Sequence, residues 1–346
     1  MKRPTQVDVA RLAGVSRATV SYVINGQTKG RVKISDETQQ RVIDAIATLG
    51  YVPDAQAQAL RSGSTNTIGV VLPDVYNPHF WQYVDGIQQE AYRVGYRLIL
   101  SSSSSLDENE DSILEELVTR RIDGLILQGQ YPSLDQENGV LPYDSRAVRR
   151  KLPVVTIGAV KATRIDSIWA DYRRGTDEVM DYLLELGHTK IGFINGVKDP
   201  VLGLDRVEPY REKLATAGIA PDEALMVRCG PAIDDGYEAA MCLLQRKPRP
   251  SAMLVINDLL AIGALRAAAD LKIQVPEQLS IVSYDDIPMA RHTVPRLTTV
   301  SKDPVAFGRR AVQLLLARVR DPELPTQKIS MPVRFIIRET TGPAPA

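Results

Sequence analysis

Three side chains near the start of the chain are of types that read the edges of DNA bases. Arg17, Ala18 and Tyr22 stand in residues 17–24, which we expect to be a short helix. An arginine offers a bidentate fork to guanine, and an alanine methyl contacts the thymine methyl in the major groove. Tyr22 follows Ala18 by one turn and reaches the same groove with its ring and hydroxyl. The spacing therefore predicts a recognition helix for the major groove.

Short polar side chains surround these three residues. Such groups suit contacts to DNA phosphates. These contacts position a protein on the duplex but do not read the base sequence. The predicted phosphate-contact set is Ser16, Thr19, Ser21 and Asn25. Thr5, which we expect to cap the preceding helix together with Asp8, is added to the predicted DNA contacts.

Three short helices are expected over residues 5–49, and residue types mark their ends. Ser16 and Ser35 are N-cap types, while Gly14 and Gly50 end helices. Up to Arg61 the chain holds nine lysines and arginines against five acids, although the whole chain is neutral. The pattern predicts a helix-turn-helix that binds DNA, and an ordinary three-helix subdomain is the alternative interpretation.

From residue 67 onward, short apolar runs alternate with amphipathic helical patterns. The runs are 67–72, 97–101, 124–128, 153–158, 190–195, 252–256, 279–283 and 330–337. The helical patterns are 78–94, 108–120, 173–186, 204–217, 234–245, 258–271 and 304–319. Such alternation predicts parallel sheets covered by helices on both faces. Because the strands are too many for one small sheet, we expect two doubly wound lobes that meet near residues 160–170.

Polar residues follow several of these strands directly. Arg206 opens a helix after the strand at 190–195, and the pair Asn257-Asp258 follows the strand at 252–256. Asp285-Asp286 follow the strand at 279–283. Ligands of such sheets bind at the carboxyl ends of the strands, so we expect these groups to line a cleft between the lobes.

The sequence lacks the motifs that are typical of secreted, membrane-spanning, metal-binding and catalytic proteins. The N-terminus has no apolar signal segment, and no run is long enough to span a membrane, so we expect a cytoplasmic protein. Cys229 and Cys242 have no metal-ligand spacing and are interpreted as buried free thiols. Phosphate-loop and hydrolase motifs are absent, so we expect no enzyme, metal or cofactor. A periplasmic sugar-binding transport protein is the rival interpretation, disfavoured by the helix-turn-helix.

The string DVARLAGVSRATVSYVING at residues 8–26 closely resembles the signature of the LacI/GalR (lactose-repressor) family. GYVP at 50–53 and AQALR at 57–61 resemble its hinge, and the resemblance continues through nearly the whole chain. It implies a transcriptional regulator, by default a repressor, that binds a pseudo-palindromic operator in double-stranded DNA as a homodimer. It further implies that Leu60 wedges into the minor groove at the central step. Tyr22 departs from the arginine that is frequent at its position, so no operator sequence carries over.

The same resemblance implies a small-molecule effector between the lobes. By resemblance Arg206, Asn257 and Asp285 contact the effector, and Phe80, rather than Trp81, stacks on it. Lys302 stands where a polar residue at a lobe crossing often faces the ligand, with a solvent-facing lysine as the equal alternative. The set suits a sugar best, and a nucleoside, purine or sugar phosphate otherwise.

The predicted architecture is α/β with an N-terminal all-α helix-turn-helix and two periplasmic-binding-protein-like lobes joined by crossing strands. The expected helix-turn-helix domain is 1–50 and the hinge helix with its linker is 51–65. By resemblance, the first effector-binding lobe is 66–165 plus 300–326, and the second is 166–299 plus 327–346.

Overall fold

The computed structural model describes residues 4–24, 33–52, 64–102, 122–129, 152–160, 163–196 and 203–345. The chain divides into two compact units, Met1–Asn66 and Thr67–Ala346. The larger unit holds two six-stranded sheets. We call each sheet with its helices a lobe, the first and the second in chain order.

The smaller unit is a three-helix bundle. Its helices are α1 (Gln6–Ala13), α2 (Arg17–Ile24) and α3 (Asp36–Leu49). Thr5 and Asp8 form a capping box at the start of α1, and Gly14 ends that helix with a left-handed φ of 66°. One small apolar core joins the helices: Val9, Ala10, Ala13, Val20, Val42, Ala45 and Tyr51. The helix-turn-helix predicted from the sequence is confirmed.

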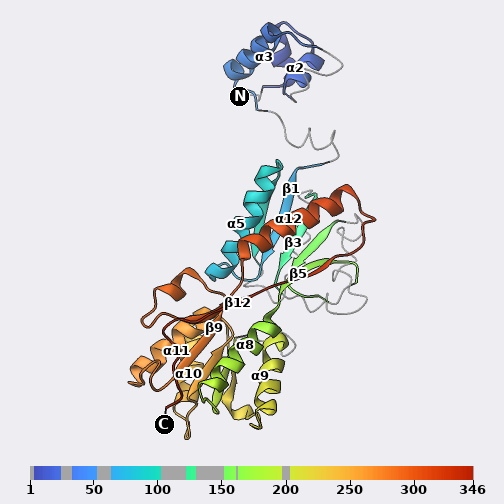
Figure 1. Cartoon of the computed structure of the whole chain (residues 1–346). Helices are drawn as coiled ribbons and strands as arrows, with labels where there is room; N and C mark the ends of the chain where they lie inside the picture. The colour runs from blue at the N-terminus through green and yellow to red at the C-terminus, as the bar shows by residue number, and fades with distance from the viewer. Residues whose placement is uncertain are drawn as a thin grey trace. The chain divides into compact units, whose positions relative to one another are not determined.

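The sheet of the first lobe is parallel at every pairing, in the order β11-β5-β4-β3-β1-β2. Its strands are β1 (Thr67–Leu72), β2 (Arg97–Ser102), β3 (Gly124–Gln128), β4 (Val154–Ile157), β5 (Asp166–Ala170) and β11 (Lys328–Met331). Helices α5 (Pro78–Arg93) and α12 (Pro304–Arg320) pack together beside this sheet (Figure 1). The two helices approach closely, because a Cβ on Gly308 would lie 2.3 Å from the Tyr83 carbonyl oxygen.

The sheet of the second lobe has the order β12-β10-β9-β8-β6-β7, and only the β10–β12 pairing is antiparallel. Its strands are β6 (Ile191–Asn195), β7 (Met226–Arg228), β8 (Ala252–Val255), β9 (Ser280–Tyr284), β10 (Thr298–Ser301) and β12 (Arg334–Ile336). Its helices are α8 (Tyr172–Glu185), α9 (Leu204–Thr216), α10 (Ile233–Leu244) and α11 (Asp258–Asp270). Short 3-10 turns are η2 (Glu223–Leu225) and η3 (Pro288–Arg291).

Alternate side chains of the second sheet pack on opposite faces. Phe193 and Leu254 join the core beneath α8 and α9, while Ile194 and Met253 join the core beneath α10 and α11. Helices therefore cover this sheet on both sides, as predicted for a parallel sheet (Figure 1).

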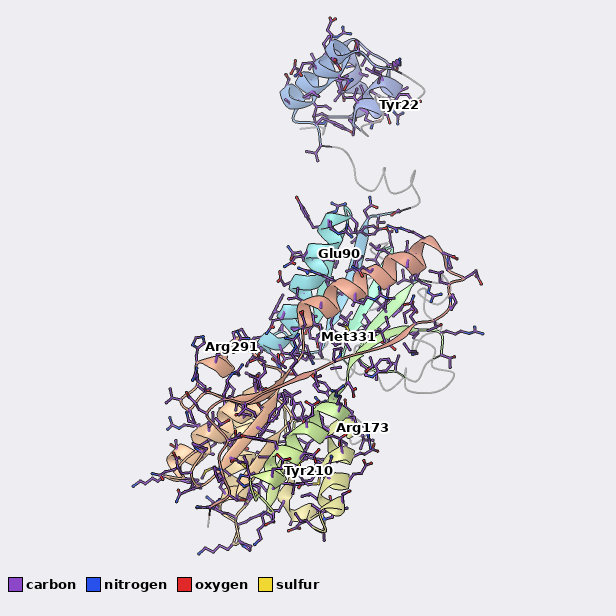
Figure 2. All side chains as sticks on the ribbon, in the orientation of Figure 1. Tyr22, Glu90, Arg173, Tyr210, Arg291 and Met331 are labelled. Carbon is purple, nitrogen blue, oxygen red and sulfur yellow. The ribbon has the colours of Figure 1, made fainter. Side chains whose placement is uncertain are left out.

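Three described connections cross between the lobes. They run from β5 into α8, from β10 into α12, and from β11 into β12. Met331, the last residue of β11, lies where the two lobes meet in Figure 2. Tyr172, the first residue of α8, and Lys302, directly after β10, therefore both stand at crossings.

Sheet membership differs from the predicted lobe boundaries at these crossings. β5 and β11 pair in the first sheet although residues from 166 and from 327 onward were assigned to the second lobe. Residues 300–301 pair in the second sheet, within β10, although they were assigned to the first lobe. β5 and β10 were not predicted as strands, because buried polar residues such as Asp166 and Ser167 interrupt the apolar pattern.

The run predicted as one strand at 330–337 is two strands in different sheets. Pro332, which has no backbone N–H to donate, lies between them. The helix predicted over 108–120 and most of the predicted hinge, 53–63, lie outside the described residues.

Candidate functional site

Helix α2 carries the predicted base-reading side chains in the smaller unit. Arg17 and Ala18 are exposed at its start, and the Arg17 Nε donates weakly to the Gln6 side-chain oxygen at 3.4 Å. Tyr22 lies a turn later and is half-buried (Figure 2). Ser16 caps the helix, since its Oγ accepts from the Thr19 N–H at 3.1 Å. An exposed arginine at the first turn of a capped helix is free to enter a groove.

Some of the side chains predicted to contact phosphate already make hydrogen bonds at the starts of helices. The Thr5 hydroxyl donates to Asp8 Oδ2 at 2.7 Å, and the Ser16 and Thr19 hydroxyls lie 2.9 Å apart. Ser21 is half-buried on α2. Backbone N–H groups at the start of a helix are suited to bind phosphate. The predicted contacts of Asn25 and Leu60 lie outside the described residues.

A second set of polar side chains meets between the two lobes. We call it the interlobe cluster and define it as His79, Tyr83, Tyr172, Arg206, Asp285 and Lys302. The first two come from α5 of the first lobe, and Asp285 and Arg206 come from β9 and α9 of the second. The remaining two stand at lobe crossings. Groups remote in sequence, from residue 79 to 302, are therefore brought to one place.

Asp285 lies at the centre of the interlobe cluster and is 7% exposed. Its Oδ1 lies 3.5 Å from His79 Nδ1 and 3.7 Å from Lys302 Nζ, and it accepts from the Tyr172 hydroxyl at 3.3 Å. Burial alone would raise the pKa of Asp285, but His79, Lys302 and Arg206 outweigh burial and hold that pKa below its usual value. Asp285 is therefore a carboxylate at neutral pH.

His79 does not share that charge. Burial lowers its pKa to about 3, and Lys302 and Arg206 lower it further against the opposing effect of Asp285. The imidazole is therefore neutral at pH 7. The ring also packs edge-on against Tyr83, with centroids 5.1 Å apart.

Both cations of the interlobe cluster contact aromatic rings. The Arg206 guanidinium carbon lies 4.2 Å from the centre of the Tyr172 ring, and Lys302 Nζ lies 4.5 Å from the same ring. Lys302 also donates to the Tyr172 hydroxyl. Burial lowers the pKa of Lys302 to about 8, with Asp285 opposing that shift. Such cation–π contacts partly replace the water that the charges have lost.

The other predicted effector contacts are placed differently. Asn257 caps α11, with its Oδ1 accepting from the Leu260 N–H at 2.8 Å, so this oxygen is occupied by the helix end. Phe80 is half-buried beside His79, with ring centroids 5.2 Å apart. Tyr210, one turn after Arg206 on α9, is buried and donates to the Ile191 carbonyl at 2.7 Å.

Two acids behind the interlobe cluster brace the loop that carries Asp285. Asp258 accepts from the Ile287 N–H at 2.7 Å and from the Thr299 hydroxyl at 2.8 Å. Asp286 accepts from Arg338 and from Arg291, the latter at 3.0 Å. Asp258 and Asp286 therefore act as structural braces of this loop rather than as free groups lining a cleft.

His79, Tyr83 and Tyr172 were not predicted for the site. Tyr172 lies two residues after the end of β5. Because that strand was not predicted, the position of Tyr172 at a strand end was not recognised. His79 follows β1 after Asn77, which caps α5 at 3.0 Å from the His79 N–H. Its position after a strand was therefore the available signal.

A cavity of about 520 Å³ lies elsewhere in the second lobe, near the start of β6. Its lining includes Lys190, Tyr210, Leu214 and Arg246, and it includes no member of the interlobe cluster. The charged residues of its lining, such as Lys190 and Arg246, are exposed, whereas the charges of the interlobe cluster are buried.

Metal and membrane signals are lacking in the described part of the chain. There, no group of three or more His, Cys, Asp or Glu side chains could hold a metal ion. Every described helix is too short or too polar to cross a membrane. Cys229 is half-buried as a free thiol, whereas Cys242 is exposed, so its predicted burial is wrong.

A helix-turn-helix unit followed by two α/β lobes with a buried polar cluster between them defines a ligand-responsive, DNA-binding regulator. The comparisons agree. Residues 5–54 match the bacterial regulatory proteins of the lacI family, and residues 180–341 match the periplasmic binding protein-like domain. The chain belongs to the lacI family and is a ligand-responsive transcriptional repressor.

Individual relatives and structures show how far the similarity extends. The chain is 31% identical to the HTH-type transcriptional repressor PurR of Vibrio atlanticus (strain LGP32), over 96% of this chain and 97% of that one. It is 32% identical to the ribose operon repressor of Escherichia coli (strain K12), over 94% and 96%. A lac repressor dimer bound to operator and an anti-inducer matches with a TM-score of 0.86 at 28% identity, over 99% and 100%.

Proposed function

We propose that this repressor is a cytoplasmic homodimer whose affinity for its operator is set by a sugar-like effector bound at the interlobe cluster. The observation that carries the proposal is the meeting of His79 and Asp285, from different lobes, at 3.5 Å. A ligand inserted between such groups changes how the lobes contact each other. The relatives are regulators, and the proposed role needs no catalysis.

Hydroxyl-rich ligands fit the chemistry of the interlobe cluster. Asp285 supplies an acceptor, Arg206 supplies donors, and Tyr172 supplies a ring and a hydroxyl within one buried region. Sugars are bound by such combinations, in which few polar groups fix the orientation of the ligand. A lacI-family regulator from Enterococcus faecium has been solved with bound ribose, at 27% identity and a TM-score of 0.71 over 80% of this chain and 99% of that one.

Regulation follows from a difference in affinity. A ligand that binds two lobe arrangements unequally shifts their populations by its differential affinity and by no more. Because Tyr172 and Lys302 stand in the connections between the lobes, a change at the interlobe cluster is transmitted along the chain. Whether the effector releases the operator or promotes its binding depends on which arrangement it favours.

A surface on the first lobe supports the homodimer. Trp81 and Tyr92 lie three turns apart on the outer face of α5 and are 44% and 84% exposed. Tyr76, at 87%, and Leu100, on the edge strand β2, are also exposed. We infer that these exposed apolar side chains contribute to the dimer interface. A twofold dimer would present two copies of α2 to the two halves of a pseudo-palindrome.

The test begins with DNA selected from a random library by the purified full-length chain. Enrichment of a pseudo-palindrome, with sedimentation showing a dimer, is the expected result. Operator binding is then measured with a panel of neutral sugars, sugar acids, sugar phosphates and nucleosides. A member that stabilises the protein against heat and changes operator affinity supports the proposal. Selection of an asymmetric half-site by a monomer, or a panel in which no member changes operator affinity, overturns it.

A further inference from the structure

Lys302 places its own side chain inside the interlobe cluster. It stands between Ser301, the last residue of β10, and Asp303, whose Oδ1 caps α12 by accepting from the Ala306 N–H at 2.9 Å. The backbone of Lys302 is therefore anchored at the crossing from the second lobe to the first. Its side chain is buried, with 6% of its surface exposed. Because a lysine has a flexible four-carbon stem, it can change its partners while its backbone stays in place.

The Lys302 ammonium contacts groups of both lobes at once. Its Nζ lies 3.7 Å from Asp285 Oδ1 of the second lobe and 5.5 Å from the centre of the Tyr83 ring of the first. It also donates to the Tyr172 hydroxyl and lies 4.5 Å from the centre of that ring. Its pKa, lowered by burial to about 8, leaves the lysine charged at pH 7, so its contact with Asp285 is a buried ion pair. Because breaking such a pair without a replacement is strongly unfavourable, the pair holds the lobes in this arrangement.

Lys302 engages the same groups that the proposed function gives to the effector. These groups are the Asp285 carboxylate and the ring and hydroxyl of Tyr172. Asp285 Oδ1, the oxygen that faces the lysine, also accepts from the Tyr172 hydroxyl at 3.3 Å. Arg206 is engaged separately, because it stacks on the Tyr172 ring and its Nε lies 3.5 Å from Asp205 Oδ1. An effector hydroxyl that donates to Asp285 Oδ1 therefore competes with the lysine for this oxygen.

We propose that Lys302 is a tethered competitor of the effector, which pairs with Asp285 in the ligand-free repressor and is displaced from it when the effector binds. This inference rests on the proposed function and adds how the site is regulated. Because the effector must break the pair, its apparent affinity is lower than its affinity for a site that is already free. The displaced lysine stands directly before Asp303 and α12, so its movement acts on the helix that packs against α5.

The test measures operator affinity and probe affinity for the full-length wild type and for variants of residue 302. Lys302→Met keeps the length of the side chain without its charge, Lys302→Arg keeps the charge, and Lys302→Gln is a second uncharged variant should Lys302→Met fold poorly. The control is Lys213→Met, because Lys213 pairs with Asp181 at 2.7 Å outside the interlobe cluster. The probes are ribose and the member of the panel above that changes the operator affinity of the wild type.

Without ligand, Lys302→Met should change operator affinity by about threefold or more, toward the value that the wild type has with saturating probe. The probe should bind Lys302→Met about tenfold or more tightly than it binds the wild type, because the competitor is gone. Lys302→Arg and Lys213→Met should stay within about threefold of the wild type in both measurements. When Asp285→Asn has already broken the pair, adding Lys302→Met should leave ligand-free operator affinity as it is.

Two results would overturn the inference. One is weaker or equal binding of the probe to the uncharged variants, Lys302→Met and Lys302→Gln. Weaker binding would show that the lysine contacts the effector directly, and it would leave the proposed function intact. The other is an unchanged ligand-free operator affinity in both uncharged variants, a comparison that needs no ligand. The proposed function fails separately, when no member of the panel changes the operator affinity of the wild type.

Discussion

His79 of the first lobe and Asp285 of the second lobe meet with Nδ1 and Oδ1 3.5 Å apart, and both are less than 8% exposed. Because the pKa of His79 is lowered to about 3, this contact joins a neutral ring to a carboxylate and is no ion pair at pH 7. The lobes are therefore held here by a weak polar contact. A ligand that binds Asp285 better than the ring does would displace it.

Asp285→Asn should abolish the response to effector while operator binding persists in at least one state. The substitution keeps the size of the side chain but removes the charge that Lys302 and Arg206 surround. Leaving buried cations unpaired costs about 3–5 kcal/mol, so the melting temperature should also fall. The measurement is operator affinity and thermal shift with and without the effector found by the panel. Asp181→Asn, at an exposed acid of α8 outside the interlobe cluster, is the control. Normal effector affinity in Asp285→Asn would contradict the site.

Arg17→Ala should reduce discrimination between operator and random DNA. The exposed guanidinium at the first turn of α2 is placed to fork onto a guanine, and a good bidentate contact is worth about 1–3 kcal/mol of discrimination. Competition binding on operator and random duplexes measures this difference. Arg11→Ala removes an exposed arginine of α1. It should lower the affinities for operator and for random DNA by the same factor, or change neither. If Arg17→Ala also weakens both alike, Arg17 contacts phosphate only.

Asp258→Asn should change how stability depends on pH. Burial, and then the charge of Asp285, raise the pKa of Asp258 to about 7, against hydrogen bonds that lower it. The folded protein therefore keeps a proton that the unfolded chain releases above its usual pKa, near 4. The contribution of this proton to the free energy of unfolding is full below about pH 4 and disappears as the pH rises through 7.

The measurement is denaturant unfolding of the wild type and the variant at several pH values. The wild type should lose stability relative to Asp258→Asn between pH 4 and 7. Asp270→Asn, at the exposed end of the same helix, should show no such trend in that range. A constant difference between wild type and Asp258→Asn would mean that Asp258 is ionised throughout.

Arg318→Ala should destabilise the first lobe strongly. The Arg318 guanidinium, on α12, binds both carboxylate oxygens of Asp166 on β5 at 3.0 and 3.1 Å, and Asp166 is 3% exposed. Removing the arginine leaves a buried carboxylate without its partner, at a cost of about 3–5 kcal/mol. Arg320→Ala, at the exposed end of the same helix, should change the free energy of unfolding by about 0.5 kcal/mol or less. Equal effects of the two variants would show that the ion pair contributes nothing specific.

Local features of the sequence were enough to predict much of this protein. The capping box of Thr5 and Asp8 and the glycine at residue 14 act within one turn, so the helix-turn-helix is visible from neighbouring residues alone. The strand-end positions of Arg206 and Asp285 follow from the rule that parallel strands end at one edge. The two mostly parallel sheets agree with the alternation of apolar runs and helical patterns along the sequence.

The remaining features depend on residues that are far apart in the chain. Asp166 and Ser167 form a buried strand only because Arg318, 152 residues away, neutralises the acid. Asn257 turned out to cap a helix. His79 and Tyr172 joined the interlobe cluster only once both lobes were in place. The energy of a buried charge is decided by every group around it, so the pairing of Lys302 with Asp285 appears only in the tertiary structure, whereas a helix cap is decided within a few residues.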